Sequence, residues 1–471
     1  MHGTERTLLL FFLLLPLTGG GLAAQQAPAD TLPLVRIDTF GARIPDDPKT
    51  TAWMEILRRG ARDGEVTAFA GYVGIELRGT SSQFWPKKQY GIETRDGKGD
   101  GIDVPLLDLP EEEDWILNAP YADRSALRNA LVYTLARDMG HYASRVRFCD
   151  LEMNGLYQGV YVLLEKIKRD KHRVSIAKLS DDDNSGDALT GGYMLKFDNL
   201  DPDEEGFTGA EDSLGSFLYI HVEPEGPDLT DAQRTYIREY IGDFERVMRS
   251  EAAHDETMGY ARYIDVASFV DFLILNELSN NIDGYIRSTF MQKDRDSRGG
   301  RLAMGPVWDF NHSFGNAHER GGRYAEGWRI HRNRVPFWWK VLLADTAFVH
   351  RLEQRWFSLR TGLLSTARLE HWIDSAAAAI APALARDHAL WRLHDTYVWM
   401  DAWESRDVSE EIHFLKTWLR DRIDWMDNHI AGIADGHPAP EHSALHAIDG
   451  IAPQPARGAI TLAFTLGMYG P

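Results

Sequence analysis

Alternation between apolar and polar positions runs through the N-terminal part of the chain and predicts mostly strands from Leu34 to about Asp198. Residues 72–77 and 88–94 alternate on either side of the loop 78–86, which predicts a β-hairpin with a long tip. The pair Asn154-Gly155 lies between two further alternating runs and is a strong signal for a second hairpin.

Helical spacing of apolar residues dominates the later part of the chain. One capping-box pattern, Thr230 with Gln233, marks the start of a helix. A short hairpin, 288–293 and 301–305, interrupts the helices. The segments predicted to be helical are about 124–139, 231–250, 265–279 and 337 to about 434.

These elements predict an α+β protein with two lobes, a sheet-rich one followed by a helix-rich one. We expect the β-rich lobe over residues 25–228 and the helical lobe, which contains the short hairpin, over 229–436. Residues 437–471 form a tail, and no internal repeat is visible.

Residues 1–24 are typical of an export signal: Arg6 precedes an apolar run, Leu8 to Leu17, and small residues end at Ala24. The run is too short for a stable membrane anchor. Ile451 to Leu466 resembles the opening of a type IX secretion sorting domain, which implies the cell surface or the medium. A short β-tail and a periplasmic location are the alternatives.

The amino-acid composition limits the kinds of molecule that the protein is expected to bind. With 71 acidic and 51 basic side chains the formal net charge is −20, which disfavours nucleic acid and mildly favours a basic protein segment. The single cysteine, Cys149, excludes an internal disulfide, and we expect it to be an inert core residue. The oligomeric state leaves no trace in the sequence.

Two aspartates flank the short hairpin, Asp283 before it and Asp309 after it. Because the hairpin brings its ends together, these carboxylates suit a divalent metal and phosphoryl transfer. Such a site also needs a cation for the phosphates, and Lys87 and Lys88 follow the serine-rich loop 78–86. The sequence spacing does not indicate which of the two lysines contacts the phosphates. The simpler interpretation is that loop aspartates cap turns and the lysines are solvated.

Six runs, in order, resemble the spore coat protein H (CotH) kinase family, in an exported bacterial branch. They are Arg78-Gly-Thr-Ser-Ser82, Trp85-Pro-Lys-Lys88, Asp123-Arg-Ser-Ala-Leu-Arg-Asn129, Asn154-Gly-Leu-Tyr-Gln-Gly-Val-Tyr161, Leu164-Glu-Lys166 and Gly305-Pro-Val-Trp-Asp-Phe310. The resemblance implies an atypical protein-kinase-like fold that uses ATP with Mg²⁺ or Mn²⁺ to phosphorylate Ser or Thr of a protein.

The resemblance also implies roles for single residues. Asp283 is the catalytic-loop aspartate and Asp309 the metal-binding one, with Asn311 as a second metal ligand and Asp283 close enough to share the ion. Lys88 holds the phosphates, with Lys87 as its substitute. The residues implied around the nucleotide are Arg78, Gly79, Ser81, Ser82, Glu165, which orients the lysine or shares a metal, and Trp308, either core or adenine-stacking. Arg128 and Asn129 are expected to brace a helix against a neighbouring loop.

One position departs from the kinase pattern. A kinase has a metal-binding Asn five residues after the catalytic Asp, where this chain has Ser288. Asn280, Asn281 or Asn311 would have to compensate. The departure keeps open a catalytically silent surface module with the same fold. A different nucleotide-dependent transferase and a secreted metallohydrolase acting on phosphates are further alternatives.

Overall fold

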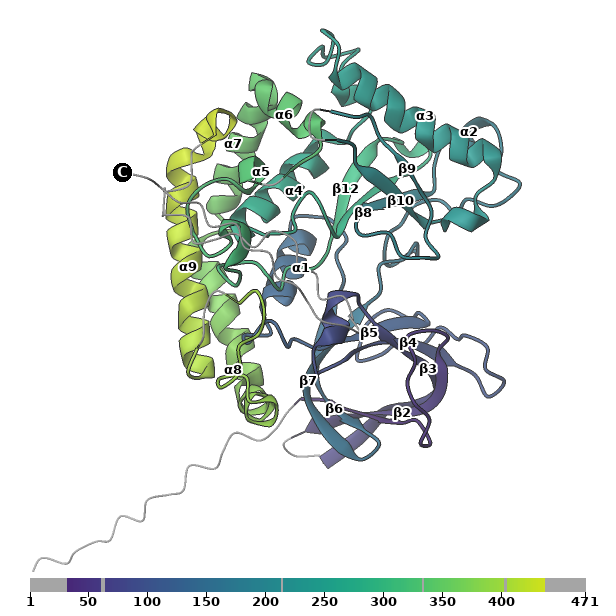
Figure 1. The fold of residues 1–471 in the computed structure, drawn as a ribbon, viewed down its shortest axis with the longest axis vertical. Coiled ribbons are helices and arrows are strands. Elements are labelled where there is room, and N and C mark those ends of the chain that lie inside the picture. The colour runs from purple at the N-terminus through teal and green to yellow at the C-terminus, as the bar shows by residue number, and fades with distance from the viewer. Residues whose placement is uncertain (1–31, 61–63, 213–214, 333, 402–404, 437–471) are drawn as a thin grey trace, which may run out of the picture.

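The computed structural model describes residues 32–60, 64–212, 215–332, 334–401 and 405–436 (Figure 1). The predicted export signal and the predicted C-terminal sorting segment lie outside these residues. Within them the protein is an α+β fold whose N-terminal part is rich in strands and whose C-terminal part is helical, as the sequence predicts.

A closed barrel forms the N-terminal part, drawn in purple to blue at the lower right of Figure 1. Its strand order is β1-β2-β3-β4-β5-β7-β6, and the parallel pair β1–β6 closes it. Both predicted hairpins are present, as β3–β4 and β6–β7. The strands are β1 Leu34–Asp38, β2 Thr50–Gly60, β3 Gly64–Arg78, β4 Gln89–Arg95, β5 Asp114–Asn118, β6 Val146–Met153 and β7 Leu156–Glu165.

Apolar side chains that alternate along these strands fill the barrel interior. Trp115, Tyr161 and Leu163 are examples, each no more than 1% exposed. Cys149 lies in this core, and burial raises the pKa of its thiol to about 12, which agrees with an inert role.

A five-stranded sheet lies above the barrel in Figure 1, in the order β12-β11-β8-β10-β9. The predicted hairpin 288–305 forms two of its strands. The other three precede residue 228, so hydrogen bonds within one sheet cross the expected lobe boundary. The strands are β8 Tyr193–Phe197, β9 Gly206–Thr208, β10 Leu218–Glu223, β11 Thr289–Lys293 and β12 Leu302–Val307.

The two faces of this sheet pack against different partners. Leu195, Phe197 and Tyr219 lie in the large core with residues of α1, α3 and α4. Met194 and Phe290, on the opposite face, pack against Ile167 and Val174. Helices cover one face of the sheet and other segments of the chain cover the opposite face. Functional side chains of this sheet are therefore expected at the ends of its strands.

Helices make up most of the remainder. The capping box at Thr230 and Gln233 is present, and the helix predicted at 124 begins instead at Arg128, because Asp123 holds residues 123–127 in a turn. No helix in the described part of the chain is long and apolar enough to cross a membrane. The helices are α1 Arg128–Asp138, α2 Gly186–Leu189, α3 Asp231–Met248, α4 Val266–Ser279, α5 Arg329–Arg332, α6 Phe337–Ala344, α7 Thr346–Arg360, α8 Thr366–Trp391 and α9 Val408–His429.

A buried ion pair joins the barrel to α8. Lys87 Nζ lies 2.5 Å from Asp387 Oδ1 and also donates to the Val160 carbonyl, and both charged side chains are at most 1% exposed. The same carboxylate oxygen accepts the Val160 N–H. A Cβ at Gly159, where φ is +93°, would lie 1.9 Å from that oxygen, so only glycine allows the helix to approach.

We expect Asp387→Ala to lower the free energy of unfolding by about 3–5 kcal/mol, because Lys87 would remain buried without a counter-charge. Urea denaturation followed by circular dichroism measures the change. Lys88→Ala is the matched control: its Nζ donates to the Gln83 carbonyl at the surface of the barrel, so its loss is about 1 kcal/mol or less. Equal losses in the two variants would show that the ion pair does not join the two parts.

Candidate active site

Three strands of the five-stranded sheet end at the same edge. Antiparallel pairing aligns Thr289 of β11 with Phe197 of β8 on one side and with Val307 of β12 on the other. Asp198, Ser288 and Asp309 therefore come together just beyond the strand ends. The Ser288 hydroxyl lies 3.5 Å from Asp198 Oδ2. The hairpin therefore brings Asp309 close to the loop that carries Asp283, as the sequence predicts.

Asp283 lies in the loop between α4 and β11 and is partly exposed. Its Oδ1 lies 3.8 Å from Arg287 and 3.6 Å from Arg320. Its backbone N–H donates to Asn281 Oδ1, and the Asn281 amide also donates to the Asp309 carbonyl. Asn281 therefore ties the two aspartate loops together.

Negative charge accumulates at this edge. Burial, and then the charges of Asp283 and Asp198, raise the pKa of Asp309 to about 7, and only Arg78 acts in the opposite direction. Burial, with a contribution from Asp283, also raises the pKa of Asp198. Arg287 and Arg320 lie near Asp283, whereas within the described residues Asp198 and Asp309 form no ion pair, and a bound divalent cation would relieve the repulsion between them.

The backbone here is held in uncommon conformations. Asn280, Tyr285, Ser288 and Asp309 have φ of 48°, 72°, 46° and 62°, in the left-handed region that residues other than glycine seldom adopt. Such strain persists only where surrounding contacts enforce it, and it gathers at functional sites.

Helix α1 supplies those contacts to the loop after β12. Tyr133 Oη accepts the Asp309 N–H at 3.2 Å, and Asn129 Oδ1 accepts the Phe310 N–H at 2.6 Å. Trp308 stacks on Tyr133 with ring centroids 5.7 Å apart. Arg128 is buried and donates to the Ser313 carbonyl. Arg128 and Asn129 thus brace α1 against a neighbouring loop, as predicted.

Arg78 reaches this loop from the end of β3. Its guanidinium lies over the Trp308 ring, 5.6 Å from the centroid, and feels the charge of Asp309. Within the described residues it donates no side-chain hydrogen bond. The two predicted lysines are engaged elsewhere, Lys87 with Asp387 and Lys88 with the Gln83 carbonyl. Arg78 is therefore a cation of the barrel that lies near Asp309 and whose N–H donors no described residue accepts.

The serine-rich loop begins directly after Arg78. Gly79 has φ +90°, and a Cβ there would lie 2.0 Å from Ser82 Oγ, so glycine is required for the turn. Ser81 and Ser82 open a short 3₁₀ turn, Ser81–Phe84. Ser81 is exposed and Ser82 partly so.

Of two further predicted residues, Glu165 has a partner for its side chain, and Asn311 has one only for its backbone carbonyl. Glu165 is fully buried, accepts from Arg145 at 2.7 Å, and has no hydrogen bond with Lys87 or Lys88. Asn311 is partly buried just after Asp309, and its carbonyl accepts from the Asn316 amide. Asp198 was missed by the sequence reasoning. Its only signal was its place directly after an alternating strand.

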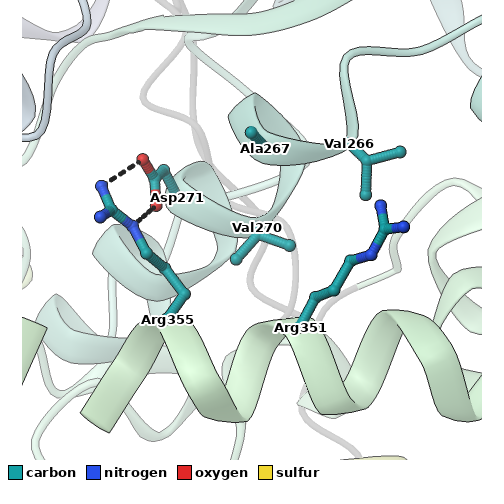
Figure 2. Close-up of a pocket in the computed structure, with 6 residues that line it drawn as sticks. All are labelled: Val266, Ala267, Val270, Asp271, Arg351 and Arg355. Atoms are coloured by element: carbon teal, nitrogen blue, oxygen red, sulfur yellow. Dashed lines mark hydrogen bonds and ion pairs between the residues drawn. The ribbon is translucent and has the colours of Figure 1, made fainter. Parts of the chain in front are cut away.

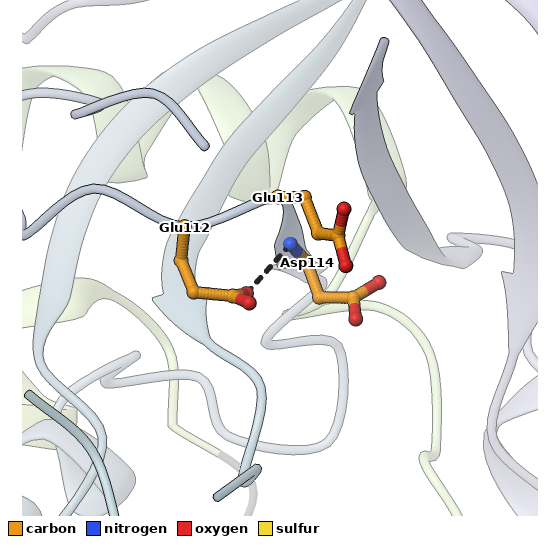
Figure 3. Close-up of side chains that lie close together, drawn as sticks. All are labelled: Glu112, Glu113 and Asp114. Atoms are coloured by element: carbon orange, nitrogen blue, oxygen red, sulfur yellow. Dashed lines mark hydrogen bonds between the residues drawn. The ribbon is translucent and has the colours of Figure 1, made fainter. Parts of the chain in front are cut away.

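Two other features are accounted for by protein contacts. Among the described residues, only Glu112, Glu113 and Asp114 bring three carboxylate oxygens within 4.8 Å of one another (Figure 3), and Lys168 lies 2.7–3.1 Å from all three. A hollow of about 160 Å³ between α4 and α7 contains the ion pair of Asp271 with Arg355 (Figure 2). Neither includes a residue of the sheet edge.

The family model described as CotH kinase protein matches residues 75–426. Among curated proteins, the chain is similar to the inner spore coat protein H of Bacillus subtilis (strain 168), with 24% identity over 200 residues, 42% of this chain and 49% of that protein. The chain thus spans about half the length of the curated relative it matches.

We expect Asp309→Asn to stabilise the metal-free protein by on the order of 1–2 kcal/mol at pH 8. The folded-state pKa of Asp309, about 7, lies above its ordinary value of 3.8. Ionisation therefore costs stability as the pH rises through this window, and asparagine avoids the cost. Thermal melts in EDTA at pH 5 and pH 8 measure the effect, with the exposed Asp203→Asn as control. A gain that is the same at both pH values would contradict the explanation.

Proposed function

This chain belongs to the CotH kinase family, and on that premise we propose that it transfers the γ-phosphate of ATP to a Ser or Thr hydroxyl of a protein, with Mg²⁺ or Mn²⁺ as cofactor. The observation that carries the proposal is the convergence of Asp283 and Asp309 at one sheet edge, beside an arginine without a protein hydrogen-bond partner in the described residues.

The donor set fits a hard divalent cation. It consists of carboxylate and amide oxygens, and burial, followed by the charges of Asp283 and Asp198, raises the pKa of Asp309. Asp309 would hold the metal, with Asn311 and Asp283 at hand. A bound divalent ion would neutralise the phosphate oxygens of ATP during transfer. The chain's own residues provide the remaining chemistry.

Asp283 would accept a hydrogen bond from the substrate hydroxyl and orient it toward the phosphate. Its own carboxylate oxygen Oδ1 lies 3.8 Å from Arg287 and 3.6 Å from Arg320, which hold the side chain in place. Arg78 would donate its N–H fork to phosphate oxygens, and the Gly79–Ser82 loop would add hydroxyl and backbone donors. Trp308 would supply the flat surface on which Arg78 lies. Lys88 remains a candidate for a second phosphate contact.

The arrangement supports a two-lobed kinase-like interpretation. Arg78 belongs to the barrel, whereas Asp309 follows the five-stranded sheet, so the proposed site would lie where these two parts meet. ATP bound there would contact both. We also propose export to the cell surface or medium, based on residues 1–24 and 451–466, and a basic protein segment as substrate, based on the charge of −20.

A catalytically silent module is the second candidate function. The specific observation that favours it is Ser288, a weaker metal ligand than the Asn of kinases at this position. Such a module would keep the fold and bind nucleotide without turnover.

Incubation of the purified chain with γ-labelled ATP, Mn²⁺ or Mg²⁺ and a Lys/Arg/Ser-rich peptide tests the proposal. We expect label on peptide serine for the wild type and at least a roughly 10²-fold lower rate for Asp283→Asn. Mass spectrometry locates the phosphate. Nucleotide binding without transfer would favour the silent module, and phosphate release without a labelled acceptor would favour a hydrolase.

We expect Arg78→Ala to weaken ATP binding by about tenfold, because the phosphates lose a charge-assisted hydrogen-bond donor. Lys88→Ala should change binding less, since Lys88 already donates to the Gln83 carbonyl. Isothermal titration with a non-hydrolysable ATP analogue measures both, and thermal melts confirm folding. A larger loss of affinity for Lys88→Ala than for Arg78→Ala would show that the lysine is the main phosphate-binding residue.

A further inference from the structure

Ser288 and Asp198 are neighbours although they lie 90 residues apart in the sequence. Ser288 immediately precedes β11, Asp198 immediately follows β8, and the pairing of Thr289 with Phe197 sets them side by side. Ser288, which stands where a kinase has its metal-binding Asn, therefore lies beside a carboxylate that follows another strand.

Asp198 has a free ligand atom. Its Oδ1 accepts the Asn199 N–H at 2.9 Å. Its Oδ2 has only the long contact of 3.5 Å with the Ser288 hydroxyl, which is a weak hydrogen bond at most. Lys196, the nearest cation on its own strand, is paired with Glu204. Oδ2 thus retains lone pairs that no described residue uses fully.

Two of the asparagines that were expected to compensate for Ser288 are occupied. Asn280 is fully buried, and its Oδ1 accepts two hydrogen bonds from Arg329. Asn281 Oδ1 accepts the Asp283 N–H, and its amide donates to the Asp309 carbonyl. Their side chains hold loops in place, so neither is available to replace the missing ligand. Asn311 belongs to the Asp309 loop, and Asp198 is the oxygen donor that contacts the serine.

We propose that Asp198 is a metal ligand of the active site and takes the place of the asparagine that Ser288 replaces. Serine is smaller than asparagine, and the carboxylate of Asp198, which directly follows β8, lies 3.5 Å from the Ser288 hydroxyl. This inference rests on the proposed function, because it assigns a residue to the metal that ATP transfer requires.

The spacing of the carboxylates bears on how many ions they would hold. The oxygens of Asp198, Asp283 and Asp309 do not all lie within 4.8 Å, so one ion would not be shared by all three at their present distances. Two-metal sites hold their ions about 3.5–4 Å apart. Asp198 and Asp309 follow different strands, so in such a pair each would bind a different ion.

Mn²⁺ binding, followed by the electron paramagnetic resonance signal of free Mn²⁺ with and without a non-hydrolysable ATP analogue, tests the inference without an activity assay. We expect Asp198→Ala to weaken Mn²⁺ binding at least about tenfold. Ser288→Asn introduced into the Asp198→Ala variant should recover part of the lost affinity, because it restores the kinase ligand. Asp203→Asn, an exposed acid in the same loop, is the control for net charge.

The outcomes separate this inference from the proposed function. If the wild type binds no Mn²⁺ even with nucleotide, the metal-dependent function itself fails. If the wild type binds and Asp198→Ala binds equally well, or Asp203→Asn weakens binding as much, only the role of Asp198 is overturned. Asp198→Asn, which keeps the side-chain shape, serves as the second variant if Asp198→Ala does not fold. Circular dichroism verifies the fold of each variant.

Discussion

Like charges meet at the edge of the five-stranded sheet because three antiparallel strands end there together. Strand register is set by hydrogen bonding and by the packing of alternate side chains, so the repulsion among Asp198, Asp283 and Asp309 cannot be relieved by sliding one strand. The fold therefore tolerates a destabilising cluster, and the large core around α4 provides the stability that allows this. Proteins commonly accept such a cost where charge serves a ligand.

Two parts of the protein, helix α1 and the barrel, hold the residues at this edge in place before any ligand binds. Helix α1 holds the backbone of Asp309 and Phe310 through Tyr133 and Asn129. The barrel contributes Arg78, which rests on Trp308 rather than on a counter-ion. Side chains so constrained lose little freedom when a ligand arrives, and this lowers the entropic cost of binding. The strained φ of Asp309 is one sign of how firmly the surroundings specify the loop.

Local features could be predicted from the sequence and distant pairings could not. Both barrel hairpins and the 288–305 hairpin depend on nearby residues and were predicted, as was the brace at Asn129. Asp198 was missed because its neighbour in space, Ser288, directly precedes β11. Lys87 was predicted as the substitute for Lys88 at the phosphates, because its partner on α8 leaves no local signal. Barrel closure through β1 and β6 is likewise a long-range pairing.

The ion pair of Lys87 and Asp387 also bears on the order in which the chain can fold during biosynthesis. It joins residues 300 positions apart, whereas the last barrel strand is complete at Glu165. A growing chain can thus assemble the barrel strands long before the counter-charge for Lys87 exists. Contacts of such separation slow folding, and docking of α8 becomes a late step. The nascent N-terminal half would meanwhile keep its ammonium in water, with the barrel wall at Gly159 and Val160 left uncovered until the helix is made.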